Sequence, residues 1–239
     1  MRAVRLGIVA LLALSGWAVG ASAVAGHASA APCGNGATCA PDTFVVSPSA
    51  TLLASTSGTL TAGGSFTASY TEYVYRDPSN EYCATCLDFV IQVTNSANST
   101  DPLARVTNAS FTGYSVDAGY TTTKPPGAAT PGTAVPAQVG RSNSGSVVSW
   151  YFNTPATEIQ PGQGTITLVA ETNAPQFVPG IISAEDGGAA QNNAFQPSGT
   201  PAGPPPNVPE APFVPALGLL GGAFGGWAAL RRWGRSPAV

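Results

Sequence analysis

The segment LDFVIQVTN, residues 87–95, indicates the fold class of this chain more clearly than any other. Its apolar residues alternate with polar ones, and only one position breaks the alternation: the apolar set is Leu87, Phe89, Ile91 and Val93, the polar set is Asp88, Gln92 and Thr94, and the exception is Val90. A period of two is typical of a β-strand that buries one face. The segment therefore predicts a strand in a half-buried sheet.

Other segments outward from residues 87–95 give the same signal. Residues 66–75 are rich in β-branched and aromatic residues, and further strand candidates are 44–46, 105–111, 147–152, 165–171 and 178–184. Turn-forming sequences separate them at 95–101, 125–127, 143–145, 161–164 and 186–188. Helix signals are confined to the two ends. We expect an all-β domain, an antiparallel β-sandwich of immunoglobulin-like type.

The first thirty residues have the composition of a secretory signal peptide. Arg2 and Arg5 precede an apolar run at 6–19, and Ala28-Ser29-Ala30 supplies the small residues of a cleavage site. The alternative is an uncleaved N-terminal anchor. Cleavage after residue 30 would remove His27, the one histidine of the chain.

The other end of the chain carries a second apolar segment. Residues 213–230 contain no charge, and as a helix they would span about 27 Å at about 1.5 Å per residue. That length predicts a single transmembrane helix. Arg231, Arg232 and Arg235 follow it, so the basic tail 231–239 is expected to stay cytoplasmic. The alternative, a buried helix of a soluble domain, would normally show a polar stripe, and none is present.

Between the two ends we expect an exported domain at 31–195 and a Pro/Gly-rich linker at 196–212. The linker ends in a short motif made of Val208, Pro209, Glu210, Ala211 and Pro212. This motif, the apolar helix and the arginine cluster together resemble the PEP-CTERM sorting signal of bacterial surface proteins. The resemblance implies recognition by a membrane processing enzyme of the exosortase type. That family usually has Val-Pro-Glu-Pro, so a permanent membrane anchor is the alternative to cleavage.

The middle of the chain also resembles the β-sandwich ectodomains found upstream of PEP-CTERM tails. The resemblance covers residues 66–195 and implies the fold rather than an activity. The sorting-signal resemblance implies that the domain lies at the cell surface, anchored by the helix or released after processing.

Charge narrows the range of partners. Residues 31–212 hold four basic and twelve acidic residues, a net charge of −8. A domain with this negative net charge lacks the basic surface that nucleic-acid binding requires, and it is poorly suited to bind an anionic membrane surface. The acidic surface is expected to keep an exported domain soluble.

Four cysteines predict two disulfides, with three pairings open. On an extended strand Cys83 and Cys86 would lie about 10 Å apart, too far for a bridge. Either a turn brings them together, or each pairs with Cys33 or Cys39. The loop-like sequence at 76–80 favours the local pairs 33–39 and 83–86. A zinc site or a redox motif is less favoured, because the spacing and the surrounding pattern do not fit either.

Catalytic constellations are not expected. Without histidine in the mature chain, Ser-His-Asp and Cys-His chemistry are excluded. Four acids stand on strands or loops and could converge in a cleft, but solvated faces are the favoured interpretation: Glu72, Asp88, Glu158 and Glu171. Glu185 and the turn 186–188 lack the spacing of an EF-hand. We therefore expect no enzyme activity, no metal and no cofactor.

Tyrosines give the clearest hint of a ligand. Tyr73 and Tyr75 share one face of strand 66–75, opposite Phe66, Ala68, Tyr70 and Val74. If that face is exposed, the two rings could stack on the sugars of a polysaccharide; otherwise they fill a half-buried strand. The favoured function is a non-catalytic cell-surface protein, a component of the cell envelope or extracellular matrix. The alternative is a carbohydrate-binding or adhesive module that uses the tyrosine face.

Overall fold

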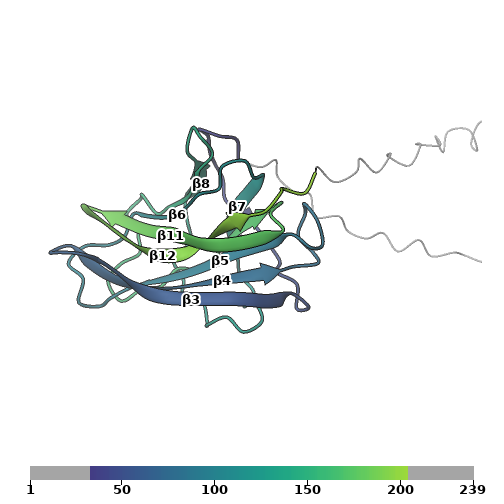
Figure 1. Cartoon of the computed structure of the whole chain (residues 1–239). Coiled ribbons are helices and arrows are strands. Elements are labelled where there is room, and N and C mark those ends of the chain that lie inside the picture. Colours follow the sequence, from purple (N-terminus) through teal and green to yellow (C-terminus); the bar gives the residue numbers. More distant parts are fainter. Residues whose placement is uncertain (1–32, 204–239) are drawn as a thin grey trace, which may run out of the picture.

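A computed structural model describes residues 33–203. These residues form two β-sheets stacked face to face, with the long strands running along the molecule (Figure 1). The expected signal peptide, sorting motif, apolar helix and basic tail lie outside the described residues. Within the described part, no helix has the length and apolar character needed to cross a membrane.

Each sheet has six strands. The first sheet has the order β1-β8-β9-β6-β11-β12, with bounds Thr38–Cys39, Gln138–Arg141, Val147–Tyr151, Arg105–Ala109, Gln176–Asp186 and Gly188–Ser198. The second sheet has the order β2-β7-β10-β5-β4-β3, with bounds Asp42–Thr43, Val116–Thr121, Thr167–Thr172, Leu87–Asn95, Phe66–Arg76 and Thr51–Ala62. The all-β prediction is therefore confirmed.

One pairing departs from the expected antiparallel pattern. The short edge strand β2 runs parallel to β7, with Asp42 opposite Gly119. A Cβ atom on Gly119 would come within 2.0 Å of the Asp42 carbonyl oxygen. The absence of a side chain at residue 119 is therefore what lets the backbone of β2 approach this edge.

The main core lies between the sheets. It contains Trp150, Phe89, Phe111 and Leu168, all fully buried, together with the remaining inward residues of both sheets. Trp150 donates its indole N–H across the core to the carbonyl oxygen of Gly119 at 2.8 Å. The sandwich therefore has a continuous apolar layer as well as a polar link between its two sheets.

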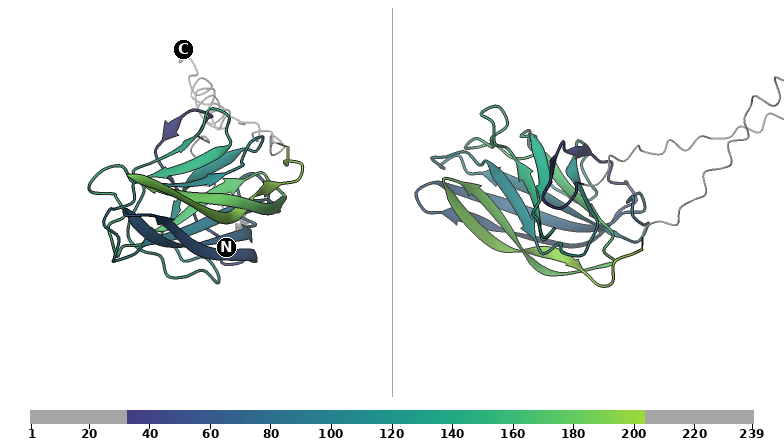
Figure 2. Two further views of the ribbon diagram at one scale, coloured as in Figure 1. Left: turned by 60° about the vertical axis from the view of Figure 1, so that its left-hand side comes forward. Right: turned by 90° about the horizontal axis from the view of Figure 1, so that it is seen from above.

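The hairpin β11–β12 closes one side of the sandwich, where β12 approaches β3 of the other sheet (Figure 2). The Asn192 side-chain amide donates to the Thr59 carbonyl oxygen at 2.9 Å. The hairpin turns at Gly187, which has a φ of +60°. At the opposite end of the molecule the chain leaves β12, and Ala202 exchanges hydrogen bonds with Asn173.

Most strand predictions agree with the structure. Residues 44–46 are the exception, because they do not form a strand; Phe44 and Val46 pack on the outer side of the second sheet. The chain also forms long strands where none was expected, at β3 and β12, and β12 includes residues 196–198 of the expected linker. β7 and β8 were not predicted either.

Candidate functional site

Both cysteine pairs form as predicted. Cys33 pairs with Cys39, at a Cα–Cα distance of 5.9 Å, and Cys83 pairs with Cys86, at 5.1 Å. A tight turn, closed by a hydrogen bond from the Cys86 N–H to the Cys83 carbonyl oxygen, makes the second pair possible. All four cysteines are paired in these two disulfides, so residues 33–203 hold no free thiol.

The alternative of an exposed tyrosine face is wrong, and the two rings fill a buried face of the strand. Tyr73 and Tyr75 do share a face, but Tyr73 is 7% exposed and Tyr75 is fully buried. They belong to a second apolar cluster on the outer side of the second sheet, together with Val46, Ala50, Val90, Ala128 and Val169.

The loop 125–129 covers this tyrosine face, together with the segment 44–50. The Tyr75 hydroxyl donates to the Pro126 carbonyl oxygen at 2.7 Å, and the Tyr73 hydroxyl accepts from the Ala129 N–H at 3.0 Å. Both tyrosines therefore hold the 125–129 loop on the sheet and cannot stack on a sugar.

The outer face of the first sheet is open instead. Strand register places Glu185, Arg105 and Tyr151 in one cross-strand row, because Glu185 pairs with Arg105 and Arg105 with Tyr151. In these strands the alternate residues point into the core, so the row faces outward. The side chains of Arg105 and Glu185 are each 36% exposed.

The next row on this face consists of small residues, in register Ser183, Thr107, Ser149 and Gly140. Small residues at the centre and larger ones around them make the face concave. A hollow of about 470 Å³ results, and its wall includes Arg105, Arg141, Tyr151, Ile181 and Gln191. We call this hollow the groove.

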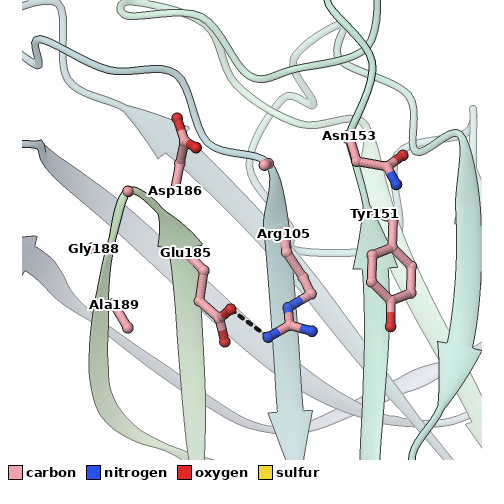
Figure 3. Close-up of a pocket in the computed structure, with 9 residues that line it drawn as sticks. Arg105, Tyr151, Asn153, Glu185, Asp186, Gly188 and Ala189 are labelled. Atoms are coloured by element: carbon pink, nitrogen blue, oxygen red, sulfur yellow. Dashed lines mark hydrogen bonds and ion pairs between the residues drawn. The ribbon is translucent and has the colours of Figure 1, made fainter.

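A second hollow of about 470 Å³ adjoins the groove at the β11–β12 turn. Figure 3 shows its lining, with Tyr151 and Asn153 on one side, Arg105 in the middle and Glu185, Asp186 and the turn on the other. Arg105, Tyr151 and Glu185 line both hollows, so the two form one continuous surface around these three residues.

Arg105 has two partners on this surface. Its guanidinium pairs with the Glu185 carboxylate, and its Cζ lies 5.8 Å from the centre of the Tyr151 ring. Burial alone would lower the pKa of Arg105, but its hydrogen bond and attraction to Glu185, with a contribution from Tyr151, raise it above the ordinary value. Arg105 is therefore held charged and in a fixed orientation beside an aromatic ring.

The side chains of the groove can bind a ligand, but they do not resemble the pair of carboxylates that a glycoside hydrolase uses. A half-exposed tyrosine offers an apolar ring with a hydroxyl at its tip, and the serines, threonine and glutamine offer hydrogen-bonding groups. Glu185 is already paired with Arg105, so two free carboxylates do not face each other across the groove.

Three of the four acids considered in the sequence are buried instead of lying on the expected solvated faces, and of the four only Asp88 and Glu171 are neighbours. Glu72 lies in the core between the sheets, and burial raises its pKa to about 8. Asp88 and Glu171 are opposite one another on the outer face of the second sheet. Glu158 lies in the loop before β10. They do not line the groove.

Sequence reasoning missed the groove because its residues come from three strands far apart in the chain. Residues 105, 151 and 185 become neighbours only through strand register. A detectable signal was the outward set of β6 and β9, in which small polar residues stand between Arg105 and Ala109 and between Tyr151 and Val147.

Comparison with known proteins identifies no relative: neither a protein-family model, nor a curated protein, nor a solved structure matches the chain.

Proposed function

We propose that this protein is a non-catalytic, exported cell-surface protein, a component of the cell envelope or extracellular matrix. The observation that carries the proposal is the pair of disulfides in the described domain. Disulfides persist in oxidising compartments outside the cytosol. They favour an extracellular location for the sandwich, which we classify as immunoglobulin-like within this proposal.

The two ends of the sequence indicate how the protein would reach the cell surface. A signal peptide at 1–30 would export the chain, and the segment 213–230 with its arginines would hold it in the membrane as a single span. The motif 208–212 would direct the protein to an exosortase-type enzyme, after which the domain is either anchored or released.

Mass spectrometry of the intact protein from native membranes and from the medium tests this proposal. We expect a chain that begins near Ala31 and is four hydrogens lighter than its fully reduced form. A cytosolic chain that keeps its first residues and its thiols would overturn the proposal. A variant in which Arg231, Arg232 and Arg235 are replaced by Ser distinguishes sorting from export. In cell fractionation this variant should still be exported, and only its retention in the membrane should change.

A second function is favoured by the groove, namely carbohydrate binding through Tyr151 and Arg105. The groove is open and concave, and it places an aromatic ring beside a fixed guanidinium and a row of hydroxyl groups. Concave sites with a few oriented polar groups are the usual form of small-ligand sites. Polysaccharide would pack on the ring and donate its hydroxyl protons to the polar rim.

Glycan-array binding tests this second function. Tyr151→Ala should abolish any binding to the array, and Arg105→Gln should weaken it. Tyr73→Phe is the matched control, because it changes a tyrosine buried on the other sheet and should leave binding unchanged. A chain that binds equally well with Tyr151→Ala would exclude the groove as the site.

A further inference from the structure

The outward side chains of the first sheet form rows that run across its strands. The row at the floor of the groove has one residue on each of four neighbouring strands, in the order Gln191, Ser183, Thr107 and Ser149. Neighbouring strands lie about 4.8 Å apart, so this row extends about 14 Å across the sheet. The floor is therefore a strip one side chain wide that crosses β12, β11, β6 and β9.

Larger side chains border this floor on both sides. The row on one side is polar and aromatic, and it separates the groove from the second hollow: Glu185, Arg105 and Tyr151. The row on the other side is apolar, and its largest member, Ile181, is 43% exposed beside Ala109 and Val147. A ligand on the floor therefore meets hydrogen-bonding groups along one flank and apolar surface along the other.

The ring of Tyr151 lies at one end of the floor. The row continues in register from Ser149 to Gly140 on β8. A Cβ atom on Gly140 would lie 3.1 Å from Tyr151 Cε2 and 3.0 Å from the Ala37 carbonyl oxygen. The missing side chain thus lets the ring approach the backbone of the neighbouring strand. The strip of small polar residues therefore ends in an aromatic ring.

The hydroxyl groups of the floor are available to a ligand. Thr107 and Ser149 are only 7% and 5% exposed, because larger side chains stand around them. Within residues 33–203, the hydroxyls of Ser183, Thr107 and Ser149 are hydrogen-bonded to no other protein group, and none of them is sealed from solvent. A hydroxyl both donates and accepts hydrogen bonds. The floor therefore suits a ligand that itself carries many hydroxyl groups.

The charges of the groove are balanced. Arg105 is neutralised by its ion pair with Glu185. Arg141 also lines the groove, but it pairs with the inward-facing Val148, and its guanidinium donates to backbone carbonyl oxygens. Residues 31–212 as a whole have a net charge of −8. An anionic polymer would therefore be repelled by the domain and would find no unpaired cation in the groove.

We infer that the groove binds a neutral polysaccharide along its length, with the sugar chain lying across the strands. This assignment rests on the carbohydrate-binding function proposed for the groove and adds the class of glycan. The long, narrow floor favours internal units of a chain over a single terminal sugar. The balanced charge of the groove, on an acidic domain, favours a neutral chain over a uronic or sulfated one.

Thr107 and Ser149 are the residues that determine this specificity. A sugar ring is about as long as one strand spacing, so about three units of the chain fit on the floor. One unit packs its apolar face on the Tyr151 ring, and the following units exchange hydrogen bonds with the hydroxyls of Ser149 and Thr107. Each floor residue therefore contributes to the binding of a chain and little to the binding of a single sugar on the ring.

A glycan array probed with the full-length chain in non-ionic detergent tests the assignment. The array carries neutral, uronic and sulfated sugars, each as a monosaccharide and as linear chains of increasing length. We expect binding of neutral chains, with an affinity that rises up to about three units and then levels off. The corresponding monosaccharides and anionic chains should bind at least about tenfold more weakly, a difference of about 1.4 kcal/mol.

Two variants of the floor locate the chain. Thr107→Val removes one hydroxyl and keeps the shape of the side chain, so it should weaken chain binding about two- to tenfold. Ser149→Leu fills the floor and should weaken chain binding more than about tenfold. Thermal unfolding checks that both variants are folded. Thr94→Val, which changes an exposed threonine on β5 of the other sheet, is the matched control and should bind the same chains normally.

Three results would overturn this assignment and leave carbohydrate binding in place. The first is equal affinity for a monosaccharide and for its chains, which would show recognition of a terminal sugar. The second is a preference for uronic or sulfated chains. The third is unchanged binding of chains in both Thr107→Val and Ser149→Leu, which would place the chain off the floor. Binding to no glycan at all would instead overturn the carbohydrate-binding function together with this assignment.

Discussion

The side-chain amide of Asn108 on β6 donates to the Glu72 carboxylate on β4 at 2.6 Å, across the interior of the sandwich. The other carboxylate oxygen of Glu72 accepts the Phe195 N–H from β12, also at 2.6 Å. One acidic side chain therefore links three strands and both sheets. Its position among apolar neighbours makes its protonation part of the stability of the fold.

Glu72 should make stability depend on pH. Burial raises its folded-state pKa to about 8 against an ordinary value of 4.5. The stabilisation is fully present below the ordinary pKa and is lost as pH rises through about 8. Glu72→Gln should reduce the fall in unfolding free energy between pH 6 and 9, by at most about 1.4 kcal/mol per pH unit.

Urea unfolding over this pH range measures the effect. Burial also raises the pKa values of Asp117 and Glu171, which act in the same direction in the variant and the wild type and so cancel from the comparison. The glutamine should be tolerated because its oxygen can accept the Phe195 N–H while its amide donates to Asn108 Oδ1 after the Asn108 side-chain amide turns over. If the variant and the wild type lose stability in parallel, the assignment to Glu72 is wrong.

Trp150 should be among the most important residues for stability. It is fully buried, and its N–H satisfies the Gly119 carbonyl oxygen of the other sheet. Trp150→Phe removes that donor and part of the ring, and we expect a loss of about 2–3 kcal/mol. Trp150→Ala should cost about 3–5 kcal/mol. Chemical denaturation measures both, and a loss well below about 1 kcal/mol for Trp150→Phe would contradict the role of the hydrogen bond.

The buried tyrosines should affect stability and not ligand binding. Tyr75→Phe removes the hydrogen bond to Pro126, and Tyr73→Phe removes the one to Ala129. Each should lower the unfolding free energy by about 1 kcal/mol. Faster proteolysis within residues 122–134 would show that the loop has loosened. A change in glycan binding in either variant would contradict the assignment of glycan binding to the groove.

The two disulfides should stabilise the fold to a similar extent. Replacing Cys83 and Cys86 together by Ala should cost about 2 kcal/mol by loop-closure entropy, and replacing Cys33 and Cys39 together should cost a similar amount. Chemical denaturation of both double variants measures these losses, and a double variant as stable as the wild type would contradict the prediction.

The sequence predicted what depends on local periodicity. The alternation at 87–95 gave the inward face of β5, and the pattern at 66–75 correctly put Tyr73 and Tyr75 on the face opposite Val74. The pairing of Cys83 with Cys86 followed from a turn signal close by. In each case the residues that determine the structure lie within a few positions of one another.

Features that depend on distant residues were missed. β3 and β12 are built largely from Ser, Thr, Gly, Ala and Asn, and they become strands through pairing rather than through apolar alternation. The burial of Tyr75 depends on a loop some fifty residues later in the chain. The groove, and the row formed by Asp88, Glu171 and Asp117, likewise arise from strand register, which periodicity does not reveal.

The two ends of β12 have a mechanical consequence. The groove lies beside the Gly187 turn, and the chain leaves the sandwich at the other end of β12, past Ala202 (Figure 1). Tension between a bound polymer and the tail would pull along the strands, so the β11–β12 ladder would be loaded in shear. Its hydrogen bonds would then resist together instead of opening one after another.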